Sequence, residues 1–308
     1  MASSRVLLTG ACGFIGRHIC RQARDRGYSV YGLDLVDVPA PELEPGHYFR
    51  NGDHPNDLAR FVENVRPEIC IHAAGAASVG ESLRDPASDF ASGPALTFAL
   101  LDALRCAAPD CRTLFLSSAA VYGDPEHLPV SEDAPVAPIS PYGFHKFQCE
   151  LLCREFSQVY GMKIATVRIF SAYGEGLRRQ VLWDICRKLL LEGQLGLRGT
   201  GMETRDFIHV RDVAEGLLLV VQRALMQGEV YNLASGRAIS IQALAQMAAA
   251  ALRPEVAPHF DGVVPAGDPR FWQADIARIT ALGLAPAVAL EEGVPDYAAW
   301  CQGQLCPT

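Results

Sequence analysis

The chain has 308 residues, 49% of them hydrophobic, and a formal net charge of −8 at pH 7. This length and composition predict one large domain or two closely packed ones with a sizeable core. The acidic balance and the lack of a Lys/Arg run argue against nucleic acid or an anionic membrane surface as a partner. No apolar run reaches the roughly 20 residues of a membrane span. The first ten residues predict a buried strand rather than a signal peptide, so we expect a cytoplasmic protein.

The chain contains ten cysteines. None forms a CxxC pair, and no group of Cys and His has the spacing of a zinc site. Several lie inside apolar strand or helix patterns. We therefore expect reduced, buried thiols, with no disulfide and no metal.

The first half of the chain alternates short, β-branched apolar runs with helical patterns. Helices are predicted over residues 16–27 and 95–107. A third begins with Ser140 as N-cap and Pro141 at the first helical position, and continues to residue 160. This alternation predicts an α/β fold with a Rossmann-type, doubly wound parallel sheet. The predicted strands span residues 5–9, 29–34, 47–51, 68–74, 112–118 and 163–170.

After about residue 171 the pattern loosens and Gly and Pro become frequent, which predicts a smaller, loop-rich C-terminal domain. The stretch EVYNLAS, 229–235, is expected to rejoin the main sheet as a strand. We therefore expect a larger domain of residues 1–171 with a return segment at about 207–235. The smaller domain is expected to contain residues 172–206 and 236–308.

A glycine motif follows the first predicted strand and opens a helix. Gly10, Gly13 and Gly16 would form a tight turn that lets the backbone and a helix N-terminus approach a pyrophosphate. The second strand ends at Asp34, whose carboxylate can bond an adenosine ribose and would repel a 2′-phosphate. We therefore expect NAD as cofactor, with NADP less favoured. Asp53, after the third strand, could reach the adenine.

A second motif lies at the carboxyl end of the fifth strand, where ligands bind in open α/β sheets. Ser117 and Ser118 lie there, and Tyr142 and Lys146 share one face of the following helix. A YxxxK pair alone is more often a surface pair. Beside a dinucleotide site, Lys146, a nicotinamide cation and the helix N-terminus would all favour the phenolate. Tyr142 could then take a proton from a sugar hydroxyl as hydride leaves the same carbon, while Ser118 holds the oxygen.

The sequence resembles the extended short-chain dehydrogenase/reductases that modify nucleotide sugars, most closely the UDP-glucose 4-epimerase branch. The resemblance implies that the larger domain binds NAD and the smaller one a nucleotide sugar. It spans nearly the whole chain, through TGACGFIG, HAAGAASVGES, SSAAVYGD, SPYGFHK, VRIFSAYGEG, ETRDFIHVRDVA, VYNLASG and GDPRFWQAD.

The resemblance implies three sets of site residues. The catalytic set is Ser118, Tyr142 and Lys146. The cofactor-binding set is Gly10, Gly13, Phe14, Ile15, Gly16, Asp34, Asp53, Ala73, Ala74, Gly75 and Ser117, with Tyr142 and Lys146. The substrate-binding set is Ser78, Val79, Ser118, Ser171, Arg179, Gln180, Val181, Arg205 and Arg270. Arg179 and Arg270 are included because Pro265 stands where the family has a substrate arginine.

Several reactions occur on this scaffold. Ala119 and Ala120 stand where dehydratases carry an acid and a base, and alanine cannot move protons, which argues against 4,6-dehydration. Two hydride-transfer reactions remain: 4-epimerisation with retained NAD, and reduction of a nucleotide 4-keto-sugar by NAD(P)H. The SVGES and SSAAVYGD stretches favour the epimerase, whereas Ala77, which replaces a family lysine at the cofactor phosphates, favours the reductase. A dinucleotide-sensing binding protein is the non-enzymatic alternative, although such relatives usually lack the Tyr or the Lys.

Helices 95–107 and 142–160 are apolar on more than one face. Phe144, Phe147 and Leu151 cannot all face the sheet together with the other apolar residues of their helix. We therefore expect a homodimer built through a four-helix bundle, as the family usually forms.

Overall fold

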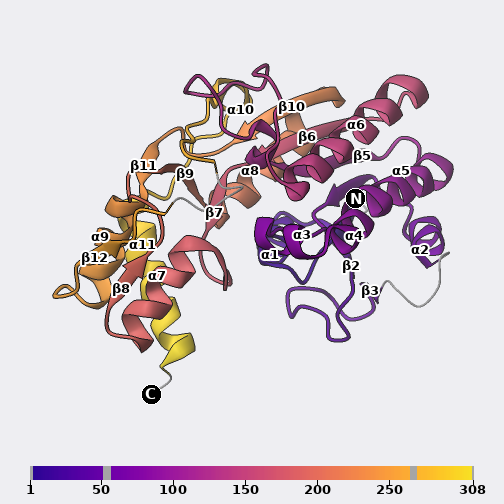
Figure 1. Ribbon diagram of the computed structural model, residues 1–308. Helices are drawn as coiled ribbons and strands as arrows, with labels where there is room; N and C mark the ends of the chain where they lie inside the picture. The colour runs from indigo at the N-terminus through magenta and orange to yellow at the C-terminus, as the bar shows by residue number, and fades with distance from the viewer. Residues whose placement is uncertain (1–2, 51–56, 264–268, 307–308) are drawn as a thin grey trace.

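The structure is a computed structural model that describes residues 3–50, 57–263 and 269–306. Figure 1 shows two parts: an α/β layer built mainly from the first half of the chain, and a smaller part built mainly from the second half.

A seven-stranded parallel sheet forms the centre of the larger part, in the order β10-β6-β5-β4-β1-β2-β3. The chain proceeds outward from β1 first in one direction and then in the other, so the carboxyl ends of β1 and β4 flank a topological switch point, where ligands bind in such sheets. The predicted parallel sheet is confirmed, and the 229–235 stretch rejoins it as β10. The strands are β1 Arg5–Thr9, β2 Ser29–Asp34, β3 Tyr48–Arg50, β4 Ile69–His72, β5 Arg112–Ser118, β6 Ile164–Ile169 and β10 Gln227–Leu233.

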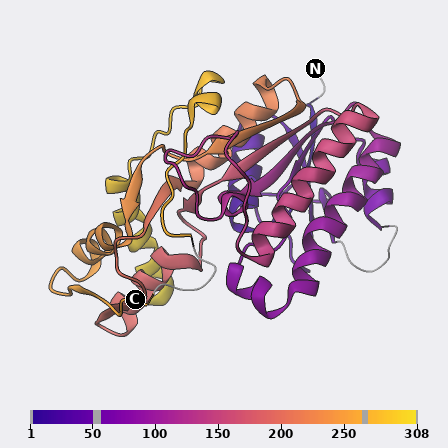
Figure 2. The ribbon, with the colours of Figure 1, turned by 45° about the horizontal axis from the view of Figure 1, so that its top comes forward.

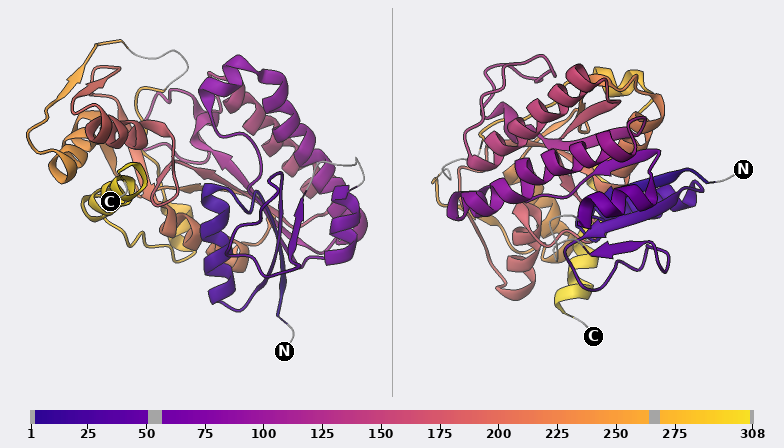
Figure 3. Two further views of the ribbon diagram at one scale, coloured as in Figure 1. Left: turned by 90° about the horizontal axis from the view of Figure 1, so that it is seen from below. Right: turned by 90° about the vertical axis from the view of Figure 1, so that its right-hand side faces the viewer.

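Helices cover both faces of this sheet, and the left panel of Figure 3 shows α1 opposite α5 and α6. Side chains of successive strand residues point to opposite faces. In β1, Val6 and Leu8 join the core beneath α1 and α8, whereas Leu7 joins the core beneath α2, α5 and α6. The helices are α1 Phe14–Asp25, α8 Val210–Arg223, α2 Asp57–Val65, α5 Leu96–Ala107 and α6 Pro141–Tyr160.

Short elements connect the sheet to the helices at the edge where the strands end. They are α3 Val79–Arg84, α4 Pro86–Phe90, the π-helical turn η1 Ala91–Ala95 and the 3-10 turn η2 Ala119–Tyr122. Within the described residues, no helix combines the length and the apolar character needed to cross a membrane.

The smaller part contains more helix than its Gly- and Pro-rich sequence predicts. In α11 the helical signal is interrupted by Pro295 and by Gly293, where an added Cβ would overlap the Tyr173 hydroxyl. The helix forms because its buried side chains share a core with α7 and α9. Besides α8 and β10, the elements after residue 170 are β7 Ser171–Tyr173, α7 Gln180–Leu191, β8 Leu195–Leu197, β9 Thr204–His209, β11 Ala238–Ser240, α9 Ile241–Leu252, β12 Pro258–Phe260, α10 Ala277–Ala281 and α11 Leu290–Leu305.

Candidate active site

The glycine turn joins β1 to α1 at the switch point of the main sheet. Gly10 has a φ of +68°, its N–H donates to the Leu33 carbonyl at 2.8 Å, and the Gly13 N–H donates back to the Gly10 carbonyl at 3.1 Å. A Cβ on Gly16 would overlap the Gly10 carbonyl oxygen, so the helix can pack on the turn only with glycine there. No side chain caps the start of α1, which leaves its first N–H groups available to an anion.

Asp34 ends β2 beside this turn. Its Oδ2 accepts the Cys12 N–H at 2.8 Å and its Oδ1 accepts the Leu35 N–H at 2.7 Å. The carboxylate is thereby fixed at the edge of the glycine turn, where it suits ribose hydroxyls and disfavours a phosphate. Asp53, expected at the adenine, lies outside the described residues.

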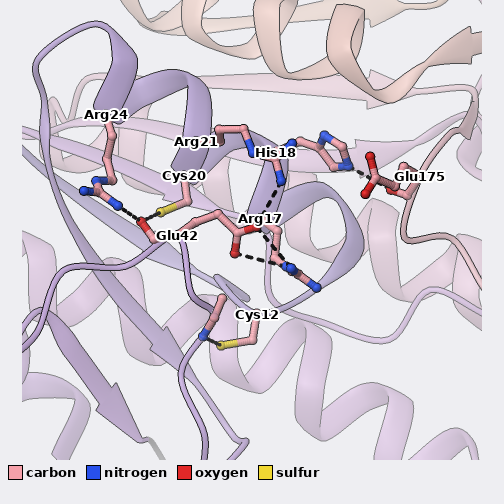
Figure 4. A network of polar contacts seen from close by, with 9 residues as sticks. Cys12, Arg17, His18, Cys20, Arg21, Arg24, Glu42 and Glu175 are labelled. Carbon is pink, nitrogen blue, oxygen red and sulfur yellow. Dashed lines mark hydrogen bonds and ion pairs between the residues drawn. The ribbon is translucent and has the colours of Figure 1, made fainter.

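Glu42 fixes the segment after β2 onto α1 (Figure 4). Its carboxylate accepts from Nε and Nη2 of Arg17 and from Nη2 of Arg21, each at 3.1 Å. The Ala40 N–H donates to Cys12 Sγ at 3.3 Å. These contacts hold the chain beyond β2 close to the glycine turn.

The residues after β4, 73–75, form the next wall. Thr9 Oγ1 accepts the Ala74 N–H at 3.1 Å and bonds His72 Nδ1 at 2.7 Å. Burial lowers the pKa of His72 to about 3, and the charge of Lys146 acts in the same direction. The imidazole is therefore neutral near pH 7 and supports the wall rather than exchanging protons.

Ser118, Tyr142 and Lys146 come from β5 and α6. Ser118 ends β5, and its Oγ accepts the Ala120 N–H at 3.2 Å. Lys146 Nζ donates to the Leu116 carbonyl at 2.9 Å and lies 5.9 Å from the centre of the Tyr142 ring. The ammonium is therefore a fixed positive charge beside the phenol.

The first turn of α6 packs tightly on η2. As predicted for the N-cap, Ser140 Oγ accepts the Gly143 N–H at 3.2 Å. A Cβ on Gly143 would lie 2.6 Å from the Ala120 carbonyl oxygen, so glycine permits this close approach. The Tyr142 N–H donates to Ser82 Oγ of α3 at 3.1 Å. These contacts bring the phenol-bearing turn against the end of β5.

A second tyrosine near the site is unsuited to proton transfer. The Tyr122 hydroxyl donates to Asn232 Oδ1 at 2.7 Å in the core. Burial raises the pKa of Tyr122 to about 12, against the opposing effect of Arg168. The half-buried Tyr142 is the phenol that faces the cavity.

The cavity continues into the smaller part. Ser171 begins β7, and residues 179–181 lie at the start of α7, where Gln180 has a φ of +67°. Such a backbone in a non-glycine residue costs of order 1–3 kcal/mol and clusters at functional sites. Arg205 of β9 lies with its guanidinium 5.3 Å over the Trp272 ring.

One cavity of about 1440 Å³ connects these walls. It exceeds the roughly 300–1,000 Å³ of an ordinary ligand pocket, so it has room for a dinucleotide and a second ligand. Of the predicted residues, it is lined by Gly10, Gly13, Phe14, Ile15, Gly16, Asp34, Ala73, Ala74, Gly75, Ser78, Val79, Ser117, Ser118, Tyr142, Lys146, Ser171, Arg179, Gln180, Val181 and Arg205.

Arg270 is not among the lining residues, although the sequence places it in the substrate set. Its Nε donates to Asp124 Oδ2 at 2.7 Å and its N–H to Asp124 Oδ1 at 2.9 Å, so its charge is matched outside the cavity. Pro265 lies outside the described residues. Two cations that the sequence did not single out, Lys188 and Arg198, line the cavity instead. Lys188 lies in a helix and Arg198 in a Gly-rich loop, and neither belongs to a motif that would mark it as a ligand-binding residue.

The turn, the acid after β2 and the Ser/Tyr/Lys group around one cavity are features of short-chain dehydrogenase/reductases that bind NAD. The NAD dependent epimerase/dehydratase family matches residues 6–234. The chain is 29% identical over 306 residues to a putative UDP-glucose 4-epimerase of Methanocaldococcus jannaschii, which covers 96% of this chain and 97% of that protein. The chain belongs to the NAD-dependent epimerase/dehydratase family.

Solved structures of UDP-glucose 4-epimerases are also similar to this chain over nearly its whole length. A UDP-glucose 4-epimerase of Thermotoga maritima with UDP-glucose has a TM-score of 0.90 and 26% identity, covering 98% of this chain and 99% of that one. A UDP-glucose 4-epimerase of Thermus thermophilus in complex with NAD has a TM-score of 0.85 and 29% identity, and the match covers 97% of this chain and 99% of that one.

Proposed function

We propose that this protein is a nucleotide-sugar 4-epimerase that acts on a UDP-hexose and inverts the configuration at C4. The observation that carries the proposal is that Ser118, Tyr142 and Lys146 meet the glycine turn in one cavity that has room for a second ligand. Two of the relatives named above are UDP-glucose 4-epimerases and the third is a putative one, which favours this reaction over the 4-keto-sugar reductase. The presence of both Tyr142 and Lys146 argues against a purely sensing role.

NAD, held at the glycine turn and Asp34, would supply the acceptor for hydride from a hydroxyl-bearing carbon and the donor that returns it to the opposite face of that carbon. Tyr142 removes the proton from the C4 hydroxyl during oxidation and gives it back during reduction. Ser118 holds the same oxygen by a hydrogen bond. Lys146, fixed by the Leu116 carbonyl, stabilises the phenolate between the two steps.

Residues 172–206 and 236–308 are proposed to hold the nucleotide part of the substrate, while residues 1–171, with a return segment at about 207–235, hold NAD. Arg179, Lys188, Arg198 and Arg205 line the cavity in the smaller part. Arg179 directly precedes the N-terminal end of α7, whereas Lys188 lies in the last turn of that helix and pairs with Asp184 at 2.8 Å. Cations and a helix N-terminus both suit a diphosphate. They would offset locally the net charge of −8 of the whole chain.

The direct test is conversion without added reductant. Purified protein incubated with UDP-glucose alone should form UDP-galactose, measured by chromatography, because hydride is returned to the carbon that lost it. Parallel reactions with GDP- and dTDP-hexoses test the base. Inertness toward all of them, combined with NADH consumption in the presence of a nucleotide 4-keto-6-deoxy-sugar, would replace the epimerase with the reductase.

A homodimer is proposed through α5 and α6, which lie side by side (Figure 2). Phe98 and Phe144 on these helices are 49% and 52% exposed, and Leu151 is also exposed. Covering them in a four-helix bundle would remove their exposed apolar surface from water. Light scattering at micromolar concentration should give a dimer, and Phe144→Glu should weaken it. Leu225→Glu, an exposed position outside these helices, should not, and a monomeric wild type would contradict the proposal.

A cytoplasmic location stays a prediction, and the cysteines support it. All ten are free thiols and most are buried. Burial raises the pKa of Cys20 and of Cys111 to about 12, which makes these thiols unreactive. A reducing compartment suits such a set.

A further inference from the structure

A buried ion pair lies directly behind the reacting groups. Glu150 lies on α6 one turn after Lys146, Arg168 lies in β6, and their side chains are 6% and 5% exposed. The guanidinium binds the carboxylate through Nε to Oε1 at 3.0 Å and Nη2 to Oε2 at 2.7 Å. Moving two charges out of water is costly, and such a pair is weak evidence for stability. Packing alone therefore does not account for it.

The carboxylate joins α6 to the end of β5. Ser117 Oγ donates to Glu150 Oε1 at 2.5 Å, and Ser117 is the register partner of Arg168 in the β5–β6 ladder. Ser118 is the next residue along β5. Glu150 thus links α6 to the adjacent strands β5 and β6, next to the residue that carries the catalytic hydroxyl.

The guanidinium braces the turn that follows. It lies 4.7 Å over the Tyr122 ring, and Arg168 Nη1 donates to the Glu132 carbonyl at 3.2 Å. Tyr122 ends η2, the turn that starts directly after Ser118. The ion pair therefore contacts each element that carries a group of the hydride-transfer site.

The position of Glu150 along α6 relates the ion pair to the phenol of Tyr142. Tyr142, Lys146 and Glu150 are four residues apart, so they lie on one face of α6. Apolar packing is non-directional and tolerates small shifts of a helix, whereas a two-bond ion pair fixes its position. A shift of about 1 Å at a reacting group can cost about 10²-fold in rate.

We infer that Glu150 and Arg168 are positioning residues for hydride transfer. They fix the helix that carries Tyr142 and Lys146 against the strand end that carries Ser118. They do not touch the reacting atoms. The inference rests on the proposed function, because the reaction whose geometry they set is the one proposed above.

Two variants test it. Glu150→Met combined with Arg168→Met removes both charges together, which proteins often tolerate without loss of stability. Arg168→Lys keeps the charge but loses the planar fork. In both we expect UDP-hexose turnover to fall at least about 10-fold with KM within about threefold of wild type. The pH dependence of turnover should also shift, because movement of α6 would loosen Lys146 from the Leu116 carbonyl and change the position of its ammonium beside the phenol.

Hydrogen exchange gives a readout that needs no substrate. Loss of the pair should speed exchange of the backbone amides of residues 142–146, while those of β1 stay protected. If the wild type lacks epimerase activity, the proposed function fails, and the exchange rates still decide whether the pair fixes α6.

Phe156→Leu is the matched control. Phe156 lies on the same helix, buried in the core and away from the pair, so its truncation lowers stability without removing a directional contact. Turnover, KM and pH dependence should stay within about twofold of wild type. Wild-type turnover and exchange in Arg168→Lys would overturn the inference, as would an equal loss of turnover in Phe156→Leu. If the double variant does not fold, Arg168→Lys decides alone.

Discussion

Replacing Tyr142 with phenylalanine should lower turnover at least about 10²-fold, the usual effect of removing a general acid/base. The change deletes only the phenol oxygen, and the ring keeps its place in the cavity lining, 5.9 Å from Lys146 Nζ. NAD retention should therefore equal that of the wild type. Initial rates of UDP-hexose epimerisation and the amount of nucleotide released on denaturation give the two measurements.

Tyr160→Phe provides the control for this experiment. It makes the same chemical change on the same helix, at the half-exposed last residue of α6. Turnover there should stay within about twofold of wild type. Near wild-type turnover in Tyr142→Phe would show that a different group moves the proton and would remove the basis of the mechanism.

The elements of the larger part could be predicted because their signals are local. The adjacent residues Ser140 and Pro141 predict the start of α6, and the structure begins the helix at Pro141. The smaller part has weaker local signals. Helix α11 contains Gly293 and Pro295, and it is stabilised by packing against α7 and α9, which no local pattern reports.

The same division holds in the site. The glycine turn and the YxxxK pair lie within a few residues each, so their arrangement follows from strand and helix geometry. Arg270 was expected at the substrate because its charge could replace that of a missing arginine. Its partner is Asp124, 146 residues earlier in the chain, and such pairing needs the folded chain. Glu150 lies in none of the motifs, and Arg168 lies in the VRIFSAYGEG stretch without an assigned role. Their relation appears only when α6 packs on β6.

Gly16→Ala should weaken NAD binding by about 10- to 100-fold. An added Cβ would overlap the Gly10 carbonyl oxygen and lie 2.9 Å from its carbon, and neither neighbour is a flexible side chain. Either the turn or α1 must therefore move. Overpacking of this kind typically costs about 1–3 kcal/mol. If this free energy is lost from the NAD-binding conformation of the turn, the affinity for NAD falls by about 10- to 100-fold, since about 1.4 kcal/mol corresponds to a factor of ten. Calorimetric titration of nucleotide-free protein with NAD measures it.

Gly303→Ala is the matched glycine control. Gly303 lies in α11, and a Cβ there would meet nothing within 4 Å. Because alanine is favoured over glycine inside a helix by about 1 kcal/mol, this variant should be at least as stable as the wild type and bind NAD equally well. If Gly16→Ala also binds NAD with wild-type affinity, the turn between β1 and α1 does not hold the pyrophosphate. The cofactor would then have to lie elsewhere along the cavity, since the close contact between Gly16 and Gly10 is what gives a pyrophosphate access to the start of α1.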